Sequence, residues 1–129
     1  MDTDICVYLI KRRPPAVIER LRSHPPGEIG VSSVTVAELS YGVEKSQHRE
    51  GNKAALRQFL LPLVVLDFNH EAALTYGEVR ATLERAGTPI GPFDTMIGAH
   101  ALHLNATLVT NNLWEFSRII GLRTENWSA

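Results

Sequence analysis

Three acidic residues, Asp2, Glu38 and Asp94, stand among apolar neighbours near the ends of expected helices and strands. Carboxylates brought together repel one another unless a cation neutralises them, and Mg²⁺ or Mn²⁺ prefers oxygen ligands. Such an ion lowers the pKa of a bound water and stabilises charge on a phosphoryl group. If the fold brings the three acids together, they predict metal-dependent chemistry at a phosphate.

Each acid also has a local structural interpretation that the residues alone leave open. Asp94 falls in the first turn of a helix, where it can satisfy backbone N–H groups and the helix dipole. Thr35 and Glu38 have the spacing of a capping box, in which the glutamate folds back onto the first residue of the helix. Asp2 is also consistent with a disordered terminal residue.

The elements that must position these acids alternate between helices and strands. The apolar periodicity and the Pro, Gly and Asn positions predict helices over 16–23, 32–46, 49–61, 69–86, 92–104 and 114–119, and strands over 28–31, 63–68, 106–110 and 122–126. The strand over 63–68 is expected to be buried because it is rich in β-branched residues. This order predicts a single α/β domain over residues 1–129 with a mostly parallel sheet. The carboxyl ends of its strands then face one crevice.

The helix expected over 92–104 carries Asp94 at its start. Gly91 and Pro92 mark that start, because proline fits the first helical position. The apolar residues at helical spacing are expected to face the core: Phe93, Met96, Ile97, Ala101 and Leu104. Gly98 and Ala101 leave a face of small groups. We expect this face to make room for the first strand and helix of the chain, which start in the apolar segment after Asp2 and bring Asp2 alongside Asp94.

Composition narrows the class of protein. The 129 residues have a net charge of −1, which argues against a surface that coats nucleic acid generically. Nine Lys and Arg oppose five Asp and Glu over residues 11–57, whereas four oppose seven over 58–129. Cys6 is the single cysteine, which excludes an internal disulfide and suits a reducing cytoplasm. The sequence shows no signal-peptide pattern and no apolar run of the roughly 18 residues that span a bilayer.

Two other kinds of site are disfavoured. His100 and His103 lie three residues apart, but no set of Cys, His and Glu completes a zinc pattern, so we interpret them as polar-edge or interface residues. A phospho-acceptor signalling domain would require a lysine at a late strand end, and residues 110–112 provide none.

Four segments together resemble one known family. They are residues 2–11, residues 29–43, residues 87–94, and residues 106–112 with Glu115 and Phe116, in this order along nearly the whole chain. In these segments the chain is similar to PIN-domain ribonucleases, specifically the VapC toxins of type II toxin–antitoxin pairs. The resemblance implies a three-layer α/β/α domain that forms a homodimer, binds Mg²⁺ or Mn²⁺ and cuts RNA.

The resemblance also assigns roles to residues of this chain. Asp2 and Asp94 become the main metal ligands, and Glu38 completes the acidic cluster directly or through water. Asn112 joins them as a catalytic residue, although many relatives have Asp at that position. Supporting roles fall to Thr3, Asp4, Thr110 and Glu115. The residues Lys11, Arg12 and Arg13 are expected either to contact the RNA backbone or to form a solvated loop.

The partners implied by the resemblance are an RNA substrate, expected to be transfer RNA, and a VapB-type antitoxin whose tail blocks the active site. Cleavage would inhibit translation in the cytoplasm. Two departures from the family pattern, Asn112 and the single residue before Asp2, favour one alternative. In that alternative the chain is a catalytically inactive PIN-like dimer that only binds an antitoxin.

Overall fold

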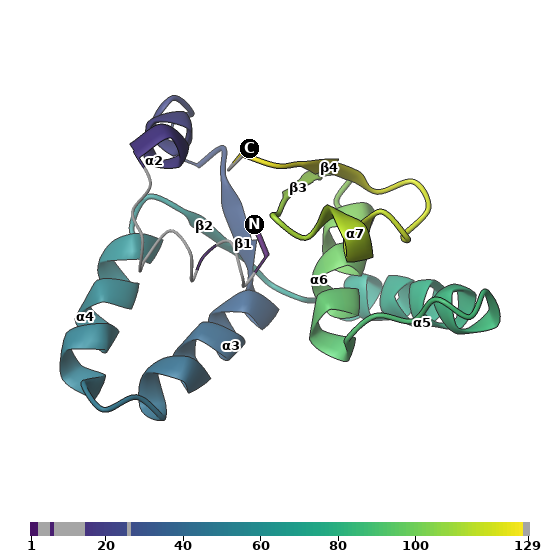
Figure 1. Ribbon diagram of the computed structural model, residues 1–129, viewed down its shortest axis with the longest axis horizontal. Helices are drawn as coiled ribbons and strands as arrows, with labels where there is room; N and C mark the ends of the chain where they lie inside the picture. Colours follow the sequence, from purple (N-terminus) through teal and green to yellow (C-terminus); the bar gives the residue numbers. More distant parts are fainter. Residues whose placement is uncertain (3–5, 7–14, 26, 128–129) are drawn as a thin grey trace.

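The computed structural model describes residues 1–2, 6, 15–25 and 27–127, and each helix and strand expected between residues 16 and 126 is present (Figure 1). The helices are α2 (Pro15–Arg22), α3 (Ser33–Glu44), α4 (Arg49–Leu60), α5 (His70–Arg85), α6 (Pro92–His103) and α7 (Leu113–Phe116). The strands are β1 (Gly30–Ser32), β2 (Val64–Leu66), β3 (Thr107–Val109) and β4 (Arg123–Glu125). This alternation confirms the predicted α/β class. None of the described helices is long and apolar enough to cross a membrane.

The strands are parallel, as predicted, but they form two pairs. β1 pairs with β2, and β3 pairs with β4. Met1 and Asp2 lie between these pairs. The Met1 amino group donates to the Gly30 carbonyl at 3.2 Å, and the Asp2 N–H donates to the Val109 carbonyl at 3.2 Å. Among the described residues, Met1 and Asp2 therefore link the two pairs through these backbone hydrogen bonds, where we expected one continuous sheet.

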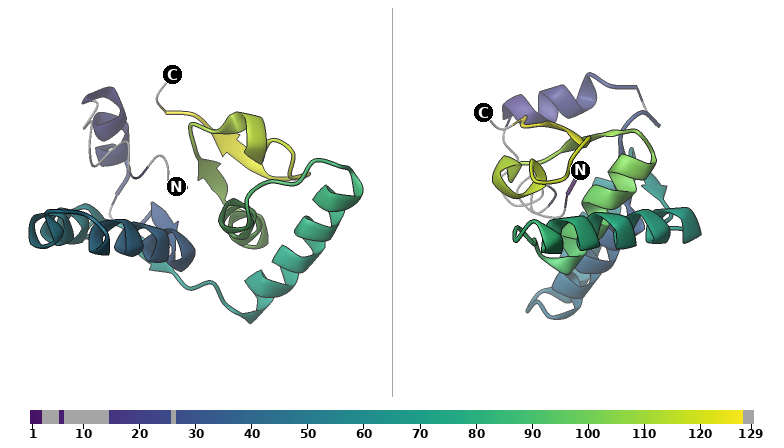
Figure 2. Two further views of the ribbon diagram at one scale, coloured as in Figure 1. Left: turned by 60° about the horizontal axis from the view of Figure 1, so that its bottom comes forward. Right: turned by 90° about the vertical axis from the view of Figure 1, so that its right-hand side faces the viewer.

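Helices cover the strands in two groups. In Figure 1 and in the left-hand view of Figure 2, α3 and α4 lie on one side of the molecule, whereas α5 packs against α6 on the other. The two groups meet where α3 contacts α6. Neighbouring residues of β3 enter different cores: Leu108 belongs to the cluster that contains Phe116, and Val109 belongs to the cluster that contains Leu39. This division follows from the alternation of side chains along a strand.

Helix α3 begins one residue later than expected and corrects the capping-box interpretation. The Ser32 hydroxyl accepts the Val34 N–H at 3.1 Å and caps the helix. Thr35 is therefore a buried residue inside the first turn and cannot be the cap that pairs with Glu38. That local interpretation of Glu38 is wrong.

Helix α6 begins with Pro92 after Gly91, as predicted, but its buried face differs from the expected stripe. Phe93 and Leu104 are 53% and 43% exposed. The buried residues of α6 are Thr95, Ile97, Gly98, Ala99 and His100. Ile97 is buried as expected, but the other buried residues of α6 are small or polar, and the large apolar residues Phe93 and Leu104 at its two ends remain exposed.

Gly98 faces the segment that follows α7. A Cβ atom at Gly98 would overlap Ile119 Cδ1 and would lie 3.4 Å from a Phe116 ring carbon. Ile119 and Phe116 are both buried. The small face of α6 thus makes room for these two side chains. The segment that we expected to lie on this face, the first strand and helix, falls largely outside the described residues, so that expectation stays a prediction.

The strand predicted to be buried, β2, lies at an edge. Val64 and Val65 are 37% and 45% exposed, and within the described chain β2 is hydrogen-bonded to β1 alone. Its β-branched composition indicated a strand correctly, but composition does not distinguish an edge strand from a central one.

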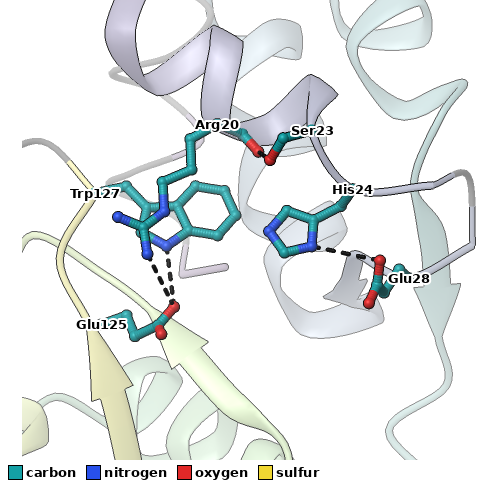
Figure 3. A network of polar contacts seen from close by, with 6 residues as sticks. All are labelled: Arg20, Ser23, His24, Glu28, Glu125 and Trp127. Carbon is teal, nitrogen blue, oxygen red and sulfur yellow. Dashed lines mark hydrogen bonds and ion pairs between the residues drawn. The ribbon is translucent and has the colours of Figure 1, made fainter.

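The end of the chain is held against α2 by stacked rings (Figure 3). The Trp127 Nε1–H donates to the Glu125 carboxylate at 3.0 Å, and the Arg20 guanidinium lies 5.3 Å from the centre of the Trp127 ring. The His24 ring stacks on Trp127 with centroids 5.5 Å apart and 4° between planes. These contacts fix α2 beside the segment that follows β4.

Candidate active site

Asp2 is a buried residue with a fixed side chain. It is 1% exposed, and its Oδ2 accepts a hydrogen bond from Thr110 Oγ1 at 2.6 Å. The interpretation of Asp2 as a disordered terminal residue is therefore wrong. Thr110 directly follows β3, so the carboxylate lies at the carboxyl end of a parallel strand, which is the edge where α/β sheets bind ligands.

The turn after β3 fixes the direction of the Thr110 hydroxyl. Its oxygen accepts the Asn112 N–H at 2.8 Å, and its single proton goes to the Asp2 carboxylate. A hydrogen bond to an ionised acceptor is shorter and stronger than a neutral one. Thr110, predicted only as a supporting residue, thus holds Asp2 directly.

Asn112 and Glu115 interact with each other at the start of α7. Asn112 Oδ1 accepts the Glu115 N–H at 3.4 Å, and its Nδ2 donates to the Glu115 carboxylate at 3.1 Å. Asn112 is therefore the N-cap of α7. The catalytic role of Asn112 stays a prediction. The observed contact between Asn112 and the site is the hydrogen bond from its backbone N–H to the Thr110 hydroxyl.

Glu38 and Asp94 lie on the two helices that meet in the middle of the molecule. Both side chains are half-buried, Glu38 in the second turn of α3 and Asp94 in the first turn of α6. One turn before Glu38, the hydroxyl of Thr35 is buried and has no hydrogen-bond partner among the described residues. A buried polar atom without a partner is uncommon in proteins.

The donor set fits a hard cation. The described residues contain no group of three or more His, Cys, Asp or Glu side chains arranged to hold a metal ion. Mg²⁺, however, is usually bound by one or two carboxylates and completes its shell with water and phosphate oxygens. The carboxylate oxygens of Asp2 and Asp94 suit that pattern. The assignment of Asp2 and Asp94 as direct ligands stays a prediction.

Five predicted residues lie outside the described part of the chain, namely Thr3, Asp4, Lys11, Arg12 and Arg13. Their proposed roles therefore rest on the sequence alone.

His100 has a different environment from the one predicted. It is 3% exposed, its Nδ1 lies 2.8 Å from the Ser32 hydroxyl, and its ring meets the Phe68 ring edge-on at 5.4 Å. Burial, and to a lesser extent His103, lowers the pKa of His100. The interpretation of His100 as a polar-edge residue is wrong. Helical periodicity could not reveal its burial, because its partner Ser32 lies 68 residues away in the sequence. His103 is exposed, as expected.

One cavity is lined by other residues than these acids. It has a volume of about 440 Å³ and lies between β1 and β3, next to Met1. Its lining includes Glu28, Glu125 and Trp127 but none of Asp2, Glu38 and Asp94. The candidate active site is therefore distinct from this cavity.

The fold and the site define a small α/β domain with a buried acid at the carboxyl ends of parallel strands. The sequence model of the PIN domain matches residues 1–121. The chain belongs to the PIN domain family, as its sequence motifs predicted.

Relatives match the chain over almost its full length. It is 48% identical over 128 residues to the tRNA(fMet)-specific endonuclease VapC of Shigella flexneri, covering 99% of this chain and 96% of that protein. It is 46% identical over 127 residues to ribonuclease VapC2 of Haemophilus influenzae, covering 98% and 96%. The chain thus falls in the VapC group of the family.

Solved structures of this group have the same fold. The chain is similar to VapBC from Salmonella typhimurium bound to DNA, with a TM-score of 0.94, 44% identity and coverage of 98% of this chain and 95% of that one. It is also similar to VapBC2 from Rickettsia felis bound to a promoter DNA fragment, with a TM-score of 0.91, 43% identity and coverage of 98% and 96%.

Proposed function

We propose that this chain is a Mg²⁺- or Mn²⁺-dependent endoribonuclease that hydrolyses RNA phosphodiester bonds. The observation that carries the proposal is the Asp2 carboxylate, buried at the strand ends and held by Thr110. Burying a charged group costs free energy. Proteins accept such a cost mainly at functional sites, so a buried carboxylate is typical of one. The VapC relatives named as ribonucleases support the same activity.

The residues of the chain act in this reaction by position and charge. Asp2 and Asp94 would hold the ion, with Glu38 acting directly or through water. When bound, the ion supplies a water of lowered pKa and neutralises charge on the phosphate. Thr110 keeps the Asp2 carboxylate in one orientation through its 2.6 Å hydrogen bond. The products would carry 5′-phosphate and 3′-hydroxyl ends.

The substrate and partner follow from the relatives. A transfer RNA is the proposed substrate, because the Shigella flexneri relative is named as specific for tRNA(fMet). A VapB-type antitoxin is the proposed partner, because the similar solved structures are VapBC assemblies. The chain would then act as a homodimeric toxin that inhibits translation in the cytoplasm until the antitoxin blocks its site.

The test is cleavage of transfer RNA by the purified chain with Mg²⁺ or Mn²⁺ and with EDTA. Asp94→Asn removes one charge with almost no change of shape, and we expect it to lower the rate at least 100-fold. Glu78→Gln removes a charge from an exposed position on α5 and should leave the rate unchanged.

Two results would contradict the proposal. The first is a rate that does not depend on the metal. The second is full activity in Asp94→Asn. A folded chain that binds its antitoxin but cuts no RNA would instead support the alternative of an inactive binding module.

A further inference from the structure

Trp114 is a large aromatic side chain left outside the core, on the short helix next to the candidate site. It is 77% exposed, whereas Phe116, two residues later on α7, is completely buried. Residues two apart on a helix do not share a face, so anchoring Phe116 in the core directs Trp114 outward. The ring is therefore presented by a fixed helix.

A cation covers this exposed ring. The Arg118 guanidinium carbon lies 5.5 Å from the centre of the Trp114 ring, within the range of a cation–π contact. Its Nη1 also donates to the Pro89 carbonyl at 3.0 Å. Arg118 is thus held in place between α7 and the loop that leads into α6, the helix that carries Asp94.

This pair adjoins the candidate site through a short, hydrogen-bonded path. Trp114 lies two residues after Asn112, the cap of α7, whose N–H donates to Thr110. Thr110 in turn donates to Asp2. Arg118 contacts the carbonyl of Pro89, five residues before Asp94 in the chain, so the pair adjoins the segments that carry both predicted metal ligands.

We propose that Trp114 and Arg118 form a stacking platform for one unpaired RNA base next to the cleaved bond. The inference rests on the proposed ribonuclease function and adds two residues, Trp114 and Arg118, that would contact the RNA beside the cleaved bond. Aromatic rings bind bases in a sequence-tolerant way, because every base has a flat π face. A paired base in a helix does not offer that face, so the platform selects unpaired over paired RNA.

Charge favours RNA over a protein as the occupant. The acids of the site repel the phosphates of RNA. Arg118 places a positive charge at the edge of that site, where it can offset this repulsion. A guanidinium can stack on a base plane and attract the adjacent phosphate at once. Tryptophan and arginine are also common in protein interfaces, so a protein partner is the outcome that the test must separate.

The experiment measures binding of a short fluorescent single-stranded RNA and of the same strand in a duplex, in EDTA and low salt. Without metal the RNA is not cut, so binding is measured independently of the proposed hydrolysis. We expect Trp114→Ala to weaken single-strand binding by roughly 5- to 100-fold and Trp114→Phe to retain most of it. The matched control is Ile120→Ala, since Ile120 is 83% exposed close to α7, and it should bind like the wild type.

Several results would overturn the platform. They are no single-strand binding by the wild type, an unchanged affinity in Trp114→Ala, or equal losses for single-stranded and duplex RNA. A changed mass in light scattering with unchanged RNA affinity would show that the ring belongs to a protein interface. If Trp114→Ala weakens single-strand binding as expected but the wild type cuts no RNA with metal, the proposed hydrolysis is wrong and the proposed platform is supported. Trp114→Phe keeps the test valid should the alanine variant fold poorly.

Discussion

The Thr110 hydroxyl donates to the Asp2 carboxylate at 2.6 Å, although 108 positions separate the two residues in the sequence. Both side chains are buried, with exposed fractions of 0% and 1%. The contact ties the beginning of the chain to the end of β3 beside the Val109–Asp2 backbone hydrogen bond. This hydrogen bond therefore contributes both to stability and to the geometry of the candidate site.

Thr110→Val should lower both stability and activity. Valine matches the shape of threonine but removes the donor to Asp2 and the acceptor for the Asn112 N–H. Losing partners of buried polar groups costs about 1–3 kcal/mol each, so we expect a loss in the free energy of unfolding of about 2 kcal/mol or more. Urea denaturation measures the loss, and RNA cleavage measures the activity.

Two controls accompany this variant. Thr110→Ser keeps the hydroxyl and should restore most of the activity. Thr107→Val makes the same chemical change at an exposed position on β3 and should have little effect. Equal stability in Thr110→Val and the wild type would show that the hydrogen bond contributes nothing to holding Asp2.

Gly98→Ala should destabilise the protein, although alanine is the better helix former. The added methyl would overlap Ile119 Cδ1 in a buried contact, and overpacking of this kind costs about 1–3 kcal/mol. Gly77→Ala, in α5, is the matched control, because nothing lies within 4 Å of its added Cβ. That variant should gain up to about 1 kcal/mol.

A double variant tests the cause of the Gly98 effect. Ile119→Val removes the Cδ1 atom that the new methyl would meet. We expect Gly98→Ala with Ile119→Val to be less destabilised than the sum of the two single variants in urea denaturation. Strict additivity would mean that the clash lies elsewhere.

The fold could be predicted from the sequence because its signals are local. Gly91 with Pro92, and Asn69 as a cap, start α6 and α5 where expected. The exposure of β2 could not be predicted in this way, because Val64 and Val65 indicate a strand without showing its neighbours. The link between the two strand pairs is made by hydrogen bonds of Met1 and Asp2 to distant segments, and no local pattern encodes them.

The site shows the same division between local and long-range information. The acids could be identified from their unusual apolar surroundings. The residues that hold them could not, because the contact of Thr110 with Asp2 and that of His100 with Ser32 each join distant segments. The Trp114–Arg118 pair did have a local signal, an aromatic followed four residues later by a cation on the segment after Asn112.

His100 should make the protein less stable in mild acid. Burial lowers the pKa of His100 in the folded state, so between the unfolded pKa near 6.5 and the lower folded pKa the unfolded chain binds a proton that the folded chain does not. Stability is therefore full above about pH 6.5 and falls as the pH decreases through that window. One proton limits the slope to about 1.4 kcal/mol per pH unit.

Urea denaturation between pH 8 and pH 5 measures this dependence. His100→Asn keeps a polar group near the Ser32 hydroxyl but cannot be protonated, so its stability should depend less on pH than that of the wild type. His70→Gln changes an exposed histidine at the start of α5 and should keep the wild-type slope. A wild-type slope in His100→Asn would assign the proton to another group.

Mn²⁺ should raise the melting temperature of the protein through the predicted carboxylate ligands. An ion that binds only the folded state stabilises it by about 2.7 kcal/mol at 100 times its Kd, which corresponds to several degrees in a chain of this size. Asp2→Asn and Asp94→Asn should each abolish most of that shift, whereas Glu78→Gln, exposed on α5, should retain it. Differential scanning fluorimetry with and without EDTA measures the effect. A shift that remains in both Asn variants would show that the ion binds at other residues. Asp2 and Asp94 would then not hold the ion that supplies the water and the charge neutralisation for the proposed hydrolysis.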